Sequence, residues 1–66
     1  MQKGFIFIAA SERYETPDAT DLYLRTRNIA SVTKTDFGAY VSYGYDDYPV
    51  ALSVEEIMSR IDKANA

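Results

Sequence analysis

The sequence contains no cysteine and no histidine. A chain without cysteine cannot form a disulfide, and a chain lacking both residue types has none of the ligands that usually hold structural zinc. A domain of 66 residues buries only about 60% of the surface that its unfolded form exposes, so its own core is marginal. With disulfides and zinc excluded, we expect the protein to gain stability by associating with copies of itself.

The same absences remove the side chains that most often carry catalysis. The remaining candidates are Asp, Glu, Lys, Tyr and Ser, and none of them stands in a recognisable catalytic arrangement. The three glycines lie far apart, so there is no glycine-rich phosphate loop. A calcium or magnesium site needs more ligands than Asp46 and Asp47, and no further carboxylate follows until Glu55. We therefore predict a protein that is not an enzyme and that needs no metal or cofactor.

No stretch of the chain approaches the roughly 20 apolar residues needed to span a bilayer. The apolar run after Lys3 is short and polarity resumes in "SERYE", which predicts a first strand rather than an export signal. Ten acidic against seven basic side chains give a net charge of −3. This charge disfavours general binding to nucleic acid or to an anionic membrane, and we expect a soluble, cytoplasmic protein.

Hydrophobic residues make up 47% of the chain, which excludes a disordered tail. In the first strand, "FIFI", alternation places Phe5 and Phe7 on one face and Ile6 and Ile8 on the other. Both faces are apolar, so this strand is expected to be covered on both sides. One predicted cover is the helix, and the other is a partner chain.

A helix is predicted over residues 54–64. Ser53 offers its hydroxyl as the N-cap, and Glu56 can reach back to the Ser53 amide, which would complete a capping box. Leu52 and Ile57 are spaced as a hydrophobic staple. At helical spacing the expected buried stripe is Val54, Ile57, Met58 and Ile61, and the side turned to water is Glu55, Arg60, Asp62 and Lys63.

Four further segments have strand patterns: residues 21–28, 29–36, 39–43 and 48–52. A bulge at residues 30 and 31 would bring Ile29 and Val32 to one face, and Pro49 indicates a strand start or an edge. Residues 11–20 are expected to form a flexible loop. We predict one α+β domain over residues 1–66, with about five short antiparallel strands packed by one C-terminal helix.

Two sets of side chains are candidates for binding. The predicted strand places Arg25 and Arg27 on one face, where two guanidinium groups can grip a phosphate or carboxylate. The alternative is a charged strand edge that resists aggregation. The full set for an anionic ligand is Arg25, Arg27, Asn28, Lys34, Tyr23 and Tyr40, in which a tyrosine would stack on a base. The second set, at the tip of the last hairpin, has no predicted structural role and is expected to contact a partner: Tyr45, Asp46 and Asp47.

The chain has six tyrosines, of which Tyr43 and Tyr48 fall on positions that face the core. Tyr23 and Tyr40 lie opposite the main aliphatic positions, so a lone domain would expose them. Tyrosine is enriched in the cores of interfaces, which favours a subunit or partner surface. Stacking on nucleobases is the alternative.

The order "LYLRTRNIASV", "GAYVSYG" and "YPVALSVEEIMSRI" resembles the small FlbD-like proteins of bacterial flagellar and swarming systems, and similar phage or mobile-element proteins of unassigned role. The matching positions are Ile29, Val32, Gly44, Val50, Ser53 and Glu56. The resemblance implies a non-enzymatic accessory protein. Our main hypothesis is a small homo-oligomeric interaction protein of bacterial or phage origin that binds and modulates another macromolecule, most simply another protein. The alternative is a small-molecule binder that sequesters an anionic ligand such as a cyclic nucleotide.

Overall fold

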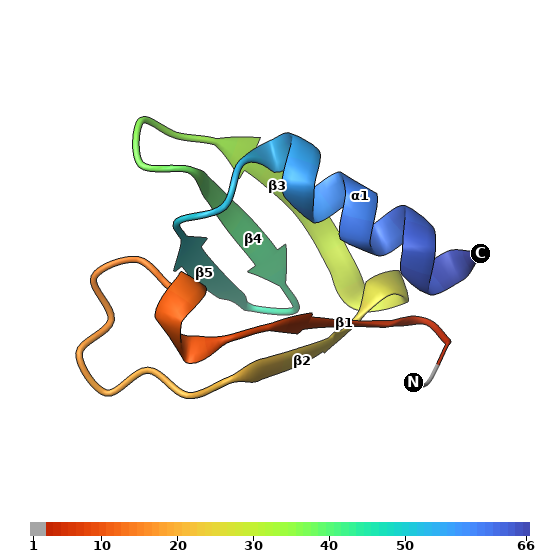
Figure 1. The fold of residues 1–66 in the computed structure, drawn as a ribbon, viewed down its shortest axis with the longest axis horizontal. Helices are drawn as coiled ribbons and strands as arrows, with labels where there is room; N and C mark the ends of the chain where they lie inside the picture. Colours follow the sequence, from red (N-terminus) through yellow and green to blue (C-terminus); the bar gives the residue numbers. More distant parts are fainter. Residues whose placement is uncertain (1–2) are drawn as a thin grey trace.

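A computed structural model describes residues 3–66 of the chain and confirms the predicted α+β class (Figure 1). Five short strands precede one helix. The strands are β1 (Phe5–Ile8), β2 (Leu22–Arg25), β3 (Ile29–Lys34), β4 (Ala39–Tyr43) and β5 (Asp46–Val50), and the helix is α1 (Val54–Asn65). Two short 3-10 turns, η1 (Ala10–Glu12) and η2 (Thr26–Asn28), follow β1 and β2.

The strands form two antiparallel sheets rather than one. β1 and β2 make a two-stranded ribbon, and β3, β4 and β5 make a three-stranded sheet in that order. The turn η2 lies between them, at the end of β2. There the Thr26 hydroxyl lies 3.2 Å from Gly4 O and 2.9 Å from Asn65 Oδ1, which ties the turn to the start of β1 and to the end of α1. The backbone N–H of Arg25 donates to the Tyr43 hydroxyl at 3.2 Å, which links the ribbon to the sheet.

Both sheets and the helix contribute to one core. α1 packs against β1 and β3 (Figure 1). The buried residues are Ile6, Ile8 and Leu24 from the ribbon, Ala39, Val41 and Val50 from the sheet, and Ile57 and Ala64 from α1. Tyr43 and Tyr48 pack against this core, as predicted. The predicted burial of Met58 is wrong, since its side chain is 43% exposed, and Ala64 extends the buried stripe instead.

The helix begins at Val54, as predicted, and ends one residue beyond the predicted range, at Asn65. The Ser53 hydroxyl accepts a hydrogen bond from the Glu56 N–H at 3.0 Å, which confirms the N-cap. The return half of the capping box does not form. The Glu56 carboxylate instead accepts from Arg60 Nε at 2.9 Å, because an acidic residue four positions before an arginine is well placed for that pair.

The β3 and β4 ladder has a register shift between Ile29 and Ser31, which confirms the predicted bulge. The last strand starts earlier than expected, because the hairpin closes on only two residues, Gly44 and Tyr45. Gly44 has φ 61°, and glycine at the first central position suits a type II′ turn. The predicted gap of four residues between the strands at 39–43 and 48–52 is therefore wrong, and Asp46 and Asp47 belong to β5.

β5 is an outer strand of its sheet, as Pro49 predicted. The first part of the 11–20 loop lies along its free edge, where Tyr14 N donates to Pro49 O at 3.0 Å and Ala51 N donates to Glu12 O at 2.8 Å. The peptide nitrogen of Pro49 points towards the same edge as its carbonyl, so its missing N–H costs no bond to β4. The loop is anchored at its start, and the flexibility of the remainder stays a prediction.

Candidate functional site

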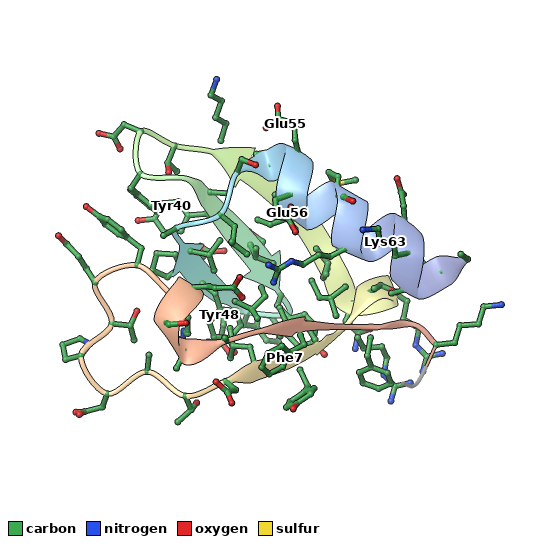
Figure 2. All side chains as sticks on the ribbon, in the orientation of Figure 1. Phe7, Tyr40, Tyr48, Glu55, Glu56 and Lys63 are labelled. Atoms are coloured by element: carbon green, nitrogen blue, oxygen red, sulfur yellow. The ribbon has the colours of Figure 1, made fainter. Side chains whose placement is uncertain are left out.

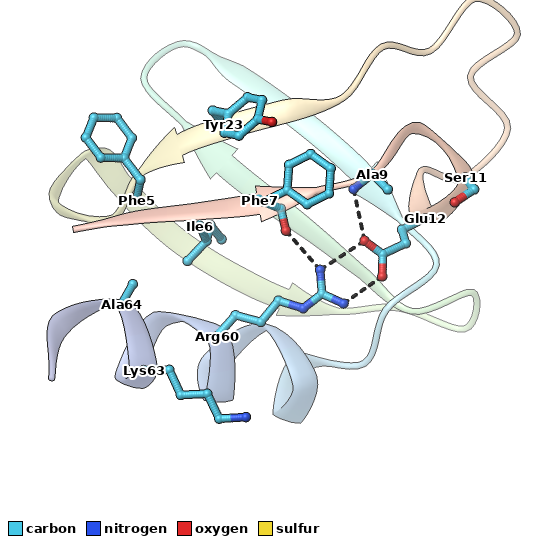
Figure 3. A pocket seen from close by; sticks show the side chains of 10 residues that line it. All are labelled: Phe5, Ile6, Phe7, Ala9, Ser11, Glu12, Tyr23, Arg60, Lys63 and Ala64. Carbon is cyan, nitrogen blue, oxygen red and sulfur yellow. Dashed lines mark hydrogen bonds and ion pairs between the residues drawn. The ribbon is translucent and has the colours of Figure 1, made fainter. Parts of the chain in front are cut away.

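The surface beside the ribbon and α1 is hollowed into an open groove with a volume of about 980 Å³ (Figure 3). The ribbon contributes aromatic side chains to it, whereas η1 and α1 contribute charged ones. The residues that define its chemistry are Phe5, Phe7, Tyr23, Glu12, Arg60 and Lys63.

The outer face of the ribbon forms the aromatic part of this groove. Register places Phe5 opposite Arg25 and Phe7 opposite Tyr23, so these four side chains share one face, called the aromatic face below. The Phe7 and Tyr23 ring centroids are 5.0 Å apart, and the Arg25 guanidinium lies 4.9 Å from the Phe5 centroid. Phe7 is 42% exposed and Tyr23 is 70% exposed. The second apolar face of β1, which was expected to be covered, is therefore open in the single chain.

Backbone pairing decides which groups of β1 are open to contact. Thr26 N donates to Gly4 O at 2.8 Å, and antiparallel ladders alternate, so Phe5 and Phe7 occupy positions that are not hydrogen-bonded to β2. Their peptide groups point towards α1, where Phe7 O accepts from Arg60 Nη1 at 3.0 Å. Ala64 O, at the other end of β1, accepts from Gly4 N at 2.9 Å. Since α1 covers this edge, β1 has no free edge to which another strand could be added, and the exposed part of β1 is its side chains.

Arg60 links the groove wall to the helix. Its Nη1 and Nη2 donate to the Glu12 carboxylate at 2.9 and 2.6 Å, and Glu12 Oε1 also accepts from Ala9 N at 2.9 Å (Figure 3). The Arg60 hydrogen bonds first, and the Ala9 N–H second, lower the pKa of Glu12 to about 2. The same contact raises the pKa of Arg60 above its ordinary value. Arg60 was expected to face water, but η1 brings a carboxylate to it.

The charge balance at the groove is opposite to that of the whole chain. Among the groove-lining residues that the structure describes, Glu12 alone carries a carboxylate, and Arg60 donates a hydrogen bond to each of its two oxygens. Within residues 3–66, neither Arg25 nor Lys63 forms a salt bridge. Arg60 also engages Glu56, so two carboxylates lie against three cations once Arg25 of the aromatic face is included. The groove and this face together carry one net positive charge in a protein whose net charge is −3, and Arg25 and Lys63 are called the cationic rim below.

The residues predicted to hold an anion do not come together as one site. β2 ends at Arg25 and Arg27 lies in η2, so the expected common strand face for the two arginines is wrong. The cause is the turn at Thr26, which takes the chain out of the ribbon. Asn28 ends η2, directly before β3, and Lys34 ends β3, so the two residues lie roughly 20 Å apart at about 3.3 Å per residue.

Tyr23 and Tyr40 are both exposed, as predicted for a lone domain, but they belong to different surfaces. Tyr40, 41% exposed, lies on β4 and packs edge-on against Phe37 at 5.3 Å, and Phe37 stacks on Tyr14 at 4.1 Å. Figure 2 shows Phe7 beside the ribbon and Tyr40 near the far end of the three-stranded sheet. Of the predicted anion-binding residues, the aromatic face contains only Tyr23 and Arg25.

At the hairpin tip, Tyr45 has a relative exposure of 108%, so it projects fully into solvent. Asp46 is exposed as well. Asp47 has a structural role that the sequence did not indicate, because its Oδ1 accepts from the Ser42 hydroxyl at 2.6 Å. Tyr45 and Asp46 remain the parts of this set that are available to a partner.

Sequence reasoning did not place Phe5, Phe7, Glu12, Arg60 or Lys63 in a site. The signal for the phenylalanines was present, because "FIFI" is apolar on both faces and only one face can turn into the core of a small domain. No local pattern indicates the ion pair between Arg60 and Glu12, since 48 positions separate them.

No protein-family model, curated protein or solved structure matches the chain. In the part of the chain that the structure describes, no helix has the length and apolar character to cross a membrane. Residues 3–66 also contain no group of three or more side chains placed to hold a metal ion. The function must therefore be inferred from the geometry and chemistry of the groove.

Proposed function

We propose that the protein is a small, non-enzymatic interaction protein that binds another protein through the groove. The observation that supports this most is the exposure of two adjoining rings, Phe7 at 42% and Tyr23 at 70%, beside a cationic rim. Contiguous exposed apolar surface rimmed by polar groups is typical of protein interaction sites. Aromatic and arginine side chains also supply most of the binding energy at interfaces.

The groove favours a segment with an apolar or aromatic side chain flanked by carboxylates. The rings would receive the apolar group, and Arg25 and Lys63 would attract the carboxylates. Both strands of the ribbon are hydrogen-bonded and Arg60 fixes the wall, so the surface is formed before the partner arrives. A preformed surface loses little conformational freedom on binding, which favours affinity.

The resemblance to FlbD-like proteins supports the wider context of this proposal. The protein acts in the cytoplasm of a bacterium, as a host or phage product, and modulates its partner by covering a surface. Capture of an anionic small molecule has weaker support. Tyr23 and Arg25 lie near each other, but Arg25 rests over the Phe5 ring, and Lys34 and Tyr40 belong to the other sheet.

A capture experiment with a matched control tests the proposal. The groove variant combines Phe7→Ser and Tyr23→Ser, and the control is Met58→Ser, which removes a side chain of nearly equal exposure, 43%, from α1. Each protein is immobilised and exposed to extract of the organism that encodes it, and the retained proteins are identified by mass spectrometry. We expect a partner that wild type and Met58→Ser retain and that the groove variant loses. An identical set of proteins on a correctly folded groove variant would refute the proposal.

A further inference from the structure

The β4–β5 hairpin tip has the chemistry that the groove is suited to receive. Tyr45 is an aromatic side chain with 108% relative exposure, and exposed Asp46 follows it directly. The groove offers aromatic rings beside Arg25 and Lys63. We propose that the groove of one copy binds the hairpin tip of a second copy, with Tyr45 inserted among the rings and Asp46 at the cationic rim. This inference rests on the proposed function, in that the groove is the docking surface.

Tyr45 is well suited to act as an anchor. The turn that carries it has only two residues and closes a regular hairpin, so the tip is held in place before binding. A tyrosine has few rotatable bonds and presents a large ring with a polar end, so it binds with a small loss of side-chain freedom. The ring also pairs favourably with other rings in tilted or edge-on arrangements such as that of Phe7 and Tyr23.

The contact must form between two copies rather than within one. In the single chain Tyr45 is fully exposed and the Phe7 and Tyr23 rings remain open, so the tip does not reach its own groove. The two surfaces differ, which makes the contact head-to-tail. Such a contact closes into a reciprocal pair or ring, or extends into a chain. It would also give a 66-residue domain with a small core the additional burial that its size favours.

The first test is the mass of the protein by analytical ultracentrifugation across a wide concentration range. The tip variant combines Tyr45→Ala and Asp46→Asn and leaves Asp47 intact, because Asp47 binds the Ser42 hydroxyl. We expect wild type to associate and the tip variant to associate at least about 30-fold more weakly, which is the effect of losing one strong interface anchor. Tyr40→Ala, a tyrosine change on the other sheet, is the matched control and should associate like wild type.

Mixing two deficient variants tests the head-to-tail geometry. The groove variant, Phe7→Ser with Tyr23→Ser, keeps its tip, and the tip variant keeps its groove. At a concentration where each variant alone is monomeric, the mixture should form a one-to-one dimer and nothing larger. If the groove variant does not fold, Arg25→Glu with Lys63→Glu replaces it, and the same result is expected.

Three results would overturn the inference: a wild type that is monomeric at millimolar concentration, association that the tip variant retains in full, or a mixture that does not pair. The outcomes also separate this inference from the proposed function. A monomeric wild type whose groove variant still loses a cellular partner leaves the proposed function in place. Association that depends on both surfaces, without any partner lost by the groove variant, refutes the proposed function and assigns the groove to self-association.

Discussion

Arg60→Ala is expected to destabilise the fold more than any other change of a charged side chain, because Arg60 joins three elements. Its guanidinium bonds to both oxygens of Glu12 in η1, to Phe7 O in β1 and to Glu56 one turn earlier in α1. The Arg60 and Glu12 side chains are each only 26% exposed, so solvent screens their pair incompletely.

The size of the effect can be worked out from these contacts. Hydrogen bonds to a charged group contribute about 1.5–3 kcal/mol to the free energy of unfolding, and partial exposure reduces the contribution of the pair between Arg60 and Glu12 to about 1–2 kcal/mol. The bond to Phe7 O adds about 1 kcal/mol, and the exposed pair with Glu56 adds about 0.3–0.5 kcal/mol. We therefore expect the free energy of unfolding to fall by about 2–3.5 kcal/mol, or Tm by roughly 10–25 °C for a domain of this size.

The assay is thermal and urea unfolding of wild type and variants, followed by circular dichroism. Arg27→Ala is the matched control, since Arg27 is exposed and forms no salt bridge within residues 3–66. Its effect should stay within about 0.5 kcal/mol. A double-mutant cycle with Glu12→Gln isolates the pair. Equal losses for Arg60→Ala and Arg27→Ala would refute the reasoning.

Acid unfolding gives an independent check of the same pair. The pKa of Glu12 falls from 4.5 to about 2 in the folded state, so the folded protein favours the ionised carboxylate. Its contribution is fully present above about pH 4.5 and is lost as pH falls towards 2. Glu12→Gln removes this titration, so its stability should fall less steeply than that of wild type over this range. If the free energy of unfolding of wild type and of Glu12→Gln fell equally between pH 4.5 and 2, the lowered pKa of Glu12 would be contradicted.

Two further predictions concern the core and the turns. Ile57→Ala should lower the free energy of unfolding by about 2–5 kcal/mol, because Ile57 is completely buried, whereas exposed Met58→Ala should cost less than about 1 kcal/mol in the same denaturation assay. An unmoved midpoint for Ile57→Ala would contradict the helix packing. Gly38→Ala should destabilise far more than Gly44→Ala, because a Cβ at Gly38 would lie 2.5 Å from Val50 O, whereas the space at Gly44 is open. Gly44→Ala should lower the free energy of unfolding by about 1–2 kcal/mol, because alanine disfavours the left-handed backbone at this position. Equal changes in Tm for Gly38→Ala and Gly44→Ala would count against this account.

Local signals predicted most of the fold. The start of α1 follows from Ser53 and the spacing of Ile57 and Ile61, and the bulge follows from two β-branched residues three positions apart. The division into two sheets was not predicted, because the turn at the break contacts Gly4 and Asn65 through Thr26, and both residues are distant from it in sequence. Strand patterns define faces but do not specify which strands pair.

The candidate site was predicted only in part, for a related reason. Tyr23 and Tyr40 were expected to be exposed, and both are, because alternation along a strand decides which side faces the core. The groove itself depends on pairing between β1 and β2, which brings Phe7 beside Tyr23. Its charged wall depends on Arg60 and Glu12, and no rule based on neighbouring residues connects them.

The bond from Gly4 N to Ala64 O has a consequence for biosynthesis. α1 follows all five strands, so the ribosome makes it after β1, and the free edge of β1 stays uncovered until residues 54–65 have been synthesised. During that interval the edge presents unpaired peptide groups beside two phenylalanines, which is the kind of segment that pairs with other chains. Slow translation of residues 54–65 would therefore extend the period in which nascent copies can aggregate, and a chaperone that shields β1 would be most useful then.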